Sequence, residues 1–164
     1  MKKGIGVLIL LGLLNLLQNQ FPRLFVSKSW MKIKIKRLKD GAKLPTYHHK
    51  GDVGMDLYSM ETVTVKPGEH YRFWHGFALE FADGYGAFIM DKGSISKAGL
   101  KTMGGVFDSG YRGEYNTHLV NLSDKSYTFE EGDKVAQLVV VPVTIASLEE
   151  VDTLNDSARG EGRF

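Results

Sequence analysis

The chain of 164 residues contains no cysteine and no long segment with helical periodicity. The absence of cysteine excludes a disulfide framework, a thiol nucleophile and a zinc site built on thiolates. The length fits one domain and excludes a TIM barrel or a two-domain dehydrogenase. Hydrophobic residues make up 43% of the sequence and charged residues 24%. This composition is typical of a globular protein rather than a disordered one.

The sequence also has little excess of charge of one sign, with a net charge of +2. The first thirty residues hold four basic residues and no acidic one, so residues 31–164, with 17 basic and 19 acidic residues, are net −2. A nucleic-acid-binding surface needs Lys and Arg clustered on the fold itself. The charge gives no support for such a surface, and we expect no nucleic-acid partner.

Residues 1–30 form an apolar extension that we separate from the fold. Lys2 and Lys3 precede the apolar run Gly4–Leu17, which is shorter than the roughly 20 residues that span a membrane comfortably. The order of charge and apolar run is typical of a signal peptide, but Phe21-Pro22-Arg23-Leu24 is a poor cleavage site. Three interpretations stay open: a start codon assigned too early, with Met31 the natural start; a signal or membrane-proximal segment; and an amphipathic partner helix. A membrane partner is expected only if residues 4–17 are an anchor.

The rest of the chain has the pattern of an all-β domain. Short alternating or apolar runs bounded by turn residues predict strands. These runs cover residues 32–36, 62–65, 70–81, 85–90, 115–122, 127–129 and 135–143. The best helical candidate is one or two turns near Ser94–Ala98. We therefore expect a sandwich or barrel over residues 31–154 and a flexible tail over residues 155–164.

Five polar segments combine glycine with functional side chains. They are Gly54-Met55-Asp56-Leu57, Asp91-Lys92-Gly93-Ser94-Ile95-Ser96, residues 105–113, Gly132-Asp133-Lys134-Val135-Ala136-Gln137 and residues 159–164. Taken singly, each is ambiguous. Asp108 is a general base or a turn-capping residue, and Ser94 binds phosphate or caps a helix. Tyr111 either stacks on a ligand or packs in the core. Gln137 either contacts a ligand or is a core amide with its hydrogen bonds satisfied. Arg159 either binds phosphate or is a solvated charge.

Taken together, the five segments resemble the five ordered motifs of the trimeric dUTPase family. Gly105-Val106-Phe107-Asp108-Ser109-Gly110-Tyr111-Arg112-Gly113 is similar to the third motif, Gly-Val-Ile-Asp-x-x-Tyr-Arg-Gly. The run from Gly132 to Leu138 is similar to the fourth motif, and Gly54-x-Asp56-Leu57 to the first. The resemblance covers essentially all of residues 31–164. Because the segments occur jointly and in order, the functional interpretations outweigh the structural ones.

The resemblance implies a jelly-roll-like β-barrel that works as a homotrimer, with active sites between subunits and the tail of one chain closing over another chain's site. It implies a cytoplasmic enzyme that hydrolyses dUTP to dUMP and pyrophosphate by water attack on the α-phosphate. This activity limits uracil in DNA and supplies dUMP. Mg²⁺ on the phosphates is the implied cofactor.

The resemblance also implies roles for residues around the nucleoside. Asp108 is the expected base that deprotonates the attacking water. Tyr111 is expected to pack under the deoxyribose and to leave no room for a 2′-hydroxyl. The hairpin backbone near Val106 and Asn116 is expected to read uracil, and Phe164 to stack on it as the tail closes.

Further residues are implied to hold the triphosphate. Lys92, Gly93 and Ser94 are expected to bind the phosphates, and Gln137 a phosphate oxygen or the water. Arg159 is expected to meet the γ-phosphate. Asp56 is expected to support Mg²⁺ through bound water, since magnesium usually keeps several waters.

Two departures and two alternatives accompany the resemblance. The second motif is usually Arg-Ser followed by Ser or Gly, but here it is Lys92-Gly93-Ser94, and lysine lacks the bidentate fork of arginine. The fifth motif stops at Phe164, without the usual Ser and Thr. A dCTP deaminase-like or bifunctional enzyme would need a glutamate where His118 stands. A non-catalytic nucleotide-binding scaffold is disfavoured by the intact Asp108, Tyr111 and Gln137.

Overall fold

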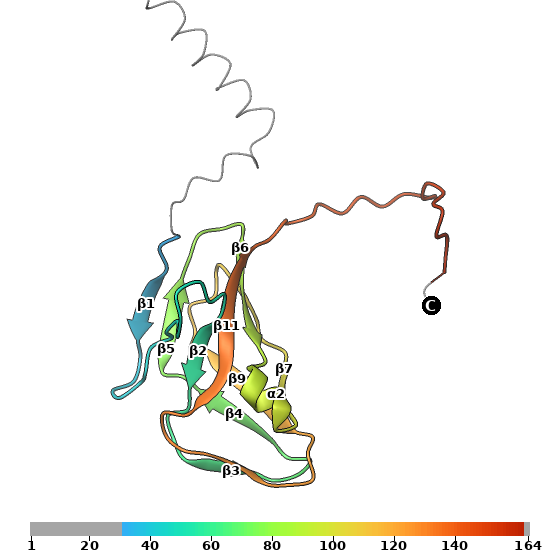
Figure 1. The fold of residues 1–164 in the computed structure, drawn as a ribbon. Helices are drawn as coiled ribbons and strands as arrows, with labels where there is room; N and C mark the ends of the chain where they lie inside the picture. Colours follow the sequence, from blue (N-terminus) through green and yellow to red (C-terminus); the bar gives the residue numbers. More distant parts are fainter. Residues whose placement is uncertain (1–30, 163–164) are drawn as a thin grey trace, which may run out of the picture. The chain divides into compact units, whose positions relative to one another are not determined.

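The computed structural model describes residues 31–162, and their regular secondary structure is almost entirely β-strand (Figure 1). The strands are β1 Lys34–Arg37, β2 Met55–Tyr58, β3 Val63–Val65, β4 His70–Trp74, β5 Phe77–Glu80, β6 Tyr85–Met90, β7 Leu100–Met103, β8 Val106–Asp108, β9 Asn116–Asn121, β10 Tyr127–Phe129 and β11 Lys134–Pro142. One short helix of the described residues, α2, covers Gly93–Lys97. The all-β prediction with one short helix is therefore confirmed. The expectations for residues 1–30 and for Phe164 lie outside the described residues.

The strands form four sheets in which all pairs are antiparallel. The largest has the order β2-β11-β6-β8, and a second has the order β4-β9-β7; β1 pairs with β5, and β3 with β10. Figure 1 shows β11, the longest strand, as an orange ribbon beside β2 and β6, with which it pairs. The second and fourth motifs therefore meet at one end of β6.

Alternation along β9 places one face of this strand in the core. In β9, Thr117, Leu119 and Asn121 are buried, while the residues between them are half-buried on the opposite face, as expected for a period of two. The buried Asn121 amide donates to the carbonyl oxygens of Val65 and Lys125 at 2.9 and 2.8 Å. The largest buried side chains are Tyr115, Phe73, Phe77, Phe129, Leu57 and Ile95.

The structure differs from the predicted strands in two respects. The predicted run over residues 70–81 is two strands, because Gly76 lies between them with a φ of +69° that other residues rarely adopt. Strands β2, β7 and β8 were not among the runs that the apolar pattern predicts as strands. Length is not the reason, because β3 and β10 have three residues and were predicted. β2 and β8 lie inside the glycine-containing polar segments and lack a run of alternating residues.

The segment after β11 makes no regular structure. Residues 143–162 form neither strand nor helix, and residues 144–162 are exposed. Ile145, Leu148 and Leu154 are among them, with 80%, 95% and 88% of their surface accessible. No helix of the part of the chain that the structure describes is long and apolar enough to cross a membrane.

Candidate active site

The predicted nucleoside-binding residues meet in one pocket. Val106, Asp108, Tyr111 and Asn116 line a cavity of about 350 Å³, together with residues that include Arg72 and His118. We call it the Asp108 pocket. Its volume lies within the range of small-molecule sites, roughly 300–1,000 Å³. The structure thus brings the acid and the aromatic ring of the third motif into one concave site.

This pocket opens where two consecutive strands part. β8 and β9 were expected to form a hairpin, but β8 pairs with β6, whereas β9 pairs with β4 and β7. β8 is consequently the edge strand of its sheet. Backbone N–H and C=O groups on the outer side of an edge strand have no strand partner and must find other hydrogen bonds. The open edge of β8 therefore offers donors and acceptors to a ligand.

Stacked aromatic rings support the turn between the two strands. The rings of Phe107 and Tyr115 lie 4.3 Å apart at an angle of 17°, and Tyr111 lies 5.4 Å from Phe107. Burial raises the pKa of Tyr115 to about 12, so its phenol stays protonated. The Tyr111 hydroxyl donates to the carbonyl oxygen of Glu114 at 3.1 Å. A Cβ on Gly113 would lie 2.4 Å from that hydroxyl, so glycine is required there to leave Tyr111 in place.

Asp108 presents an unengaged carboxylate. It is exposed, and no side chain of residues 31–162 hydrogen-bonds or ion-pairs with its carboxylate oxygens. Its backbone carbonyl accepts the Tyr111 N–H at 3.1 Å. Two further bonds fix the turn that follows: Ser109 Oγ donates to Asp83 Oδ1 at 2.7 Å, and Arg112 Nη1 donates to the Ser109 carbonyl at 2.5 Å. A carboxylate that lies on a fixed turn and makes no hydrogen bond or ion pair with another side chain is suited to take a proton from water.

The predicted phosphate-binding residues lie in a different pocket. Lys92 and Ser94 line a cavity of about 360 Å³ with Lys43 and Lys134. We call it the lysine pocket. The Lys43 ammonium sits 3.8 Å from the centre of the Tyr58 ring, which also lines this cavity. Gly93 lies between Lys92 and Ser94, at the first position of α2. Three ammonium groups in one cavity are suited to a polyanion.

Asp56 holds two of these lysines. Its Oδ1 lies 2.7 Å from Lys92 Nζ and its Oδ2 lies 2.6 Å from Lys134 Nζ, and the residue is only 4% exposed. Burial raises the pKa of Asp56, but the hydrogen bonds and charges of Lys134 and Lys92 outweigh burial, so the pKa lies below its usual value. In the free chain, Asp56 is therefore the counter-ion of the lysine pocket.

This arrangement limits how a metal could bind. Both Asp56 oxygens face ammonium groups, and residues 31–162 contain no group of three or more acidic or histidine side chains placed to hold a metal ion. Mg²⁺ typically binds through one or two carboxylates together with substrate phosphates. The described residues of one chain thus do not form a protein cage for magnesium.

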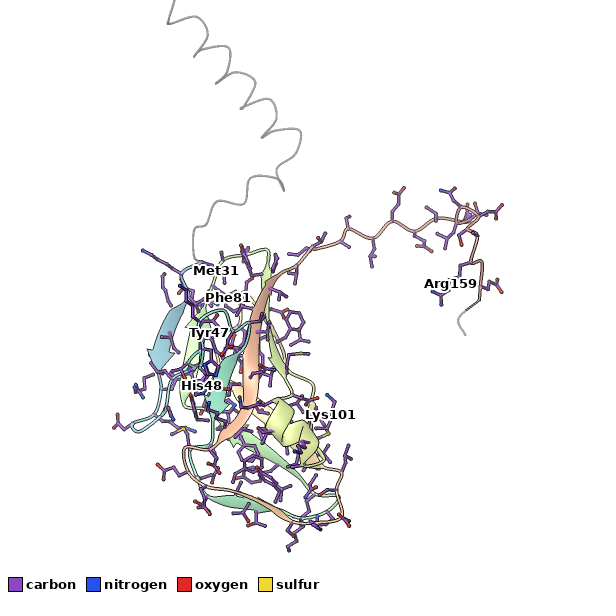
Figure 2. The ribbon with its side chains drawn as sticks, in the orientation of Figure 1. Met31, Tyr47, His48, Phe81, Lys101 and Arg159 are labelled. Atoms are coloured by element: carbon purple, nitrogen blue, oxygen red, sulfur yellow. The ribbon has the colours of Figure 1, made fainter. Side chains whose placement is uncertain are left out.

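The Gln137 side chain hydrogen-bonds to the backbone beside the lysine pocket. Its Nε2 donates to the Asp91 carbonyl at 2.8 Å. The carboxylate of Asp91 in turn accepts the N–H and hydroxyl of Thr102, both at 2.7 Å, and contacts Lys101, which Figure 2 shows at the level of α2. Gln137 lines neither the Asp108 pocket nor the lysine pocket. It braces the turn that carries Lys92.

The two pockets share no lining residue. Asp108 pairs with Gly86, near the start of β6, whereas Gln137 pairs with Met90 at its end. Four residues of strand span about 13 Å, and Lys92 lies two residues further on. A ligand that reached both Asp108 and Lys92 in one chain would therefore have to extend along β6.

The last motif contributes to neither pocket. Arg159 lies on the segment that follows β11 (Figure 2), and its Nε donates to the Gly162 carbonyl at 2.7 Å. Among the pocket residues that sequence reasoning did not assign to the site are four with basic side chains: Arg72, His118, Lys43 and Lys134. Lys134 stands inside the fourth motif and could have been found there. The other three carry no motif signal, because only strand pairing and loop packing bring them to the pockets.

An all-β fold, a pocket with an unengaged carboxylate beside a tyrosine, and a separate pocket of lysines define an enzyme class that acts on a phosphorylated, ring-containing ligand. The dUTPase family model matches residues 40–164. The chain belongs to the dUTPase family.

Relatives and solved structures agree with this assignment. The chain is similar to the deoxyuridine 5'-triphosphate nucleotidohydrolase of Clostridium tetani, with 39% identity over 80% of this chain and 93% of that protein. The Leifsonia xyli protein of the same name is 42% identical, over 74% of this chain and 83% of that one. The dUTPase of Staphylococcus bacteriophage 80alpha, a mutant bound to dUpNHpp, superposes with a TM-score of 0.75 at 27% identity, covering 81% of this chain and 96% of that one.

Proposed function

We propose that this protein hydrolyses dUTP to dUMP and pyrophosphate by attack of water on the α-phosphate, in the cytoplasm, which limits uracil in DNA and supplies dUMP. Family membership and the names of the curated relatives support this activity. The observation that carries it is the unengaged Asp108 carboxylate beside Tyr111 in one pocket.

In this proposal Asp108 orients the water and takes its proton, and Tyr111 packs under the deoxyribose. The open edge of β8 near Val106, with Asn116 opposite, hydrogen-bonds the polar edge of uracil. Lys92, Gly93 and Ser94 hold the phosphates. Charge stabilisation and positioning carry most of the catalysis in phosphoryl transfer, so the preformed lysine pocket supplies much of the binding.

The tail residues complete the proposal. Arg159 meets the γ-phosphate and Phe164 stacks on uracil when the tail closes. Gln137 positions the turn of Lys92 through the Asp91 carbonyl, and one hydrogen on its Nε2 remains for a phosphate oxygen or the water.

The site is proposed to be completed by a second copy within a homotrimer. Asp108 and Lys92 line separate pockets, and their neighbours on β6 are about 13 Å apart, which favours a site that takes the base from one chain and the phosphate-binding residues from another. Apolar side chains on the exposed segment after β11, such as Ile145 and Leu148, give the chain a means of packing on a neighbour.

Magnesium is proposed to enter with the triphosphate. One structure of a related dUTPase, from phage phi11, is described as showing a structural Mg(II) ion; it superposes with a TM-score of 0.70 at 25% identity. Bound Mg²⁺ neutralises phosphate charge. Asp56 is the acidic group beside Lys92, and it would contribute by holding the ion's waters.

The test is an assay of pyrophosphate release from dUTP by the whole chain. Asp108→Asn should lower kcat by about 10²- to 10⁴-fold, the usual contribution of a general base, while binding of dUpNHpp persists. Ammonia release from dCTP measures the deaminase alternative, which His118 in place of a glutamate disfavours. Unchanged turnover in the variant would refute the role of Asp108.

A further inference from the structure

Glu114 follows the third motif and connects the turn that carries Tyr111 to two other parts of the fold. Its carboxylate oxygen Oε1 accepts the backbone N–H of Gly76 at 2.9 Å and lies 2.9 Å from the Lys39 ammonium. Gly76 lies between β4 and β5, and Lys39 follows β1. The Glu114 side chain is only 18% exposed. One largely buried carboxylate therefore ties the turn between β8 and β9 to both segments.

The backbone carbonyl of the same residue holds two side chains of the Asp108 pocket. It accepts the Tyr111 hydroxyl at 3.1 Å and the Asn116 amide at 3.4 Å, and a carbonyl oxygen with two lone pairs can accept both. Among residues 31–162, the Tyr111 hydroxyl makes no other hydrogen bond. The hydroxyl end of this exposed ring is therefore held at the Glu114 carbonyl alone.

The peptide group that contains this carbonyl is attached to the fold on both sides. Its N–H, which belongs to Tyr115, donates to the Phe77 carbonyl at 2.9 Å. The Glu114 carboxylate supplies the second attachment, through Gly76. Gly113 precedes Glu114, and glycine leaves the backbone more freedom than other residues do. The carboxylate is thus the attachment that limits movement on the Gly113 side.

We propose that Glu114 is a positioning residue for Tyr111 and thereby sharpens the discrimination between 2′-deoxyribose and ribose. This inference rests on the proposed function, in which Tyr111 packs under the deoxyribose and leaves no room for a 2′-hydroxyl. A ring excludes one additional oxygen atom only while it stays in place, because a ring that can move makes room for it. The Glu114 side chain touches neither the ligand nor the reacting atoms in this proposal, and it acts through the Tyr111 hydroxyl.

The effect should appear in the selectivity of hydrolysis, which is the ratio of kcat/KM for dUTP to kcat/KM for UTP. The Tyr111 hydrogen bond joins neutral groups and supports about three- to tenfold. Tyr111→Phe should lower the ratio by about this factor, and Glu114→Ala by up to the same factor. Glu114→Gln should keep most of the selectivity, because its amide oxygen can still accept the Gly76 N–H. Lys39→Met removes only the ion pair, so it is the matched control and should keep the ratio.

A double-mutant cycle separates positioning from a merely structural role. If Glu114 acts through the Tyr111 hydroxyl, Glu114→Ala should cause no further loss of selectivity in the Tyr111→Phe chain, although it should lower the melting temperature of both chains. Glu114→Asp keeps the charge but is one methylene shorter, so its carboxylate should not reach Gly76; it takes the place of Glu114→Ala in the cycle if that variant does not fold. Additive losses of selectivity, or a wild-type ratio in the Glu114 variant, would overturn the proposal.

Failure of the inference and failure of the proposed function give different results. If the wild-type chain releases no pyrophosphate from dUTP, the hydrolase proposal fails. If it hydrolyses dUTP with a preference over UTP that Glu114→Ala or Glu114→Asp leaves unchanged, only the positioning role fails.

Discussion

Two inactive variants of this chain should restore each other's activity when they assemble together. Asp108→Asn removes the proposed base, and the double variant Lys92→Met, Ser94→Ala removes side chains from the lysine pocket. Each variant alone should be strongly impaired. In a mixed oligomer, some sites combine an intact Asp108 from one subunit with an intact lysine pocket from another.

The magnitude follows from the geometry. Gly86 and Met90, the β6 partners of Asp108 and Gln137, are four residues apart, or about 13 Å. A base must lie within about 3 Å of the proton it takes, or reach it through one water, and in the proposed trimer each site combines Asp108 of one chain with the lysine pocket of another. With equal amounts of both variants and random assembly, about a quarter of the sites are intact, and activity should reach about 25% of wild type.

The assay is pyrophosphate release from dUTP after the two variants are unfolded, mixed and refolded together. The control mixes Asp108→Asn with Asp108→Ala, which should stay inactive at every ratio because no subunit supplies a base. Recovery should peak at equal proportions. A mixture no more active than the sum of its separate components would refute the shared site. It would mean that the two pockets of one chain belong to the same active site.

Three further predictions concern single residues. Burial lowers the pKa of His75 from 6.5 to about 4, so between these pH values the unfolded chain binds a proton that the folded chain does not. The free energy of unfolding should fall by about 3 kcal/mol as the pH drops through this range. Urea unfolding of His75→Gln should show little of this pH dependence. The control His48→Gln, at an exposed histidine, should keep it. Gly54→Ala places a Cβ 2.2 Å from Oε1 of Gln137, so this substitution should lower the melting temperature. Gly93→Ala is the control and should not lower it in this way, because a Cβ there meets nothing within 4 Å. The pKa of Asp56 is lower in the folded chain than in the unfolded chain, so its stabilisation is complete above about pH 4 and is lost as the pH falls through the folded pKa. Asp56→Asn should therefore make the free energy of unfolding less dependent on pH in this acid range. An unchanged dependence would contradict the ion pairs.

Much of the site could be predicted because its residues lie in short motifs. The third motif places Asp108 and Tyr111 three positions apart on one turn, so their shared pocket depends mainly on local chain geometry. The pairing of Asp56 with Lys92 and Lys134 joins three different motifs. Nothing in their spacing indicates that the carboxylate faces two ammonium groups, because that contact depends on the packing of β2 beside β11.

Other elements could not be predicted for a related reason. β8 has three residues, and its pairing with β6 leaves its other edge open, an outcome that depends on pairing between strands and not on the local sequence. Arg72 and His118 are 46 positions apart and meet only through the ladder between β4 and β9.

The sequence by itself determined the all-β class and the short helix at the second motif, and it predicts Asp108 as the base, Tyr111 as the ring under the sugar and the second motif as the phosphate-binding segment. Strand periodicity and turn residues are local, and motif residues are recognised by spacing along the chain. The tertiary structure decided that the Asp108 pocket and the lysine pocket are separate and share no lining residue. That separation arises from antiparallel pairing, in which register fixes the distance between residues far apart in sequence.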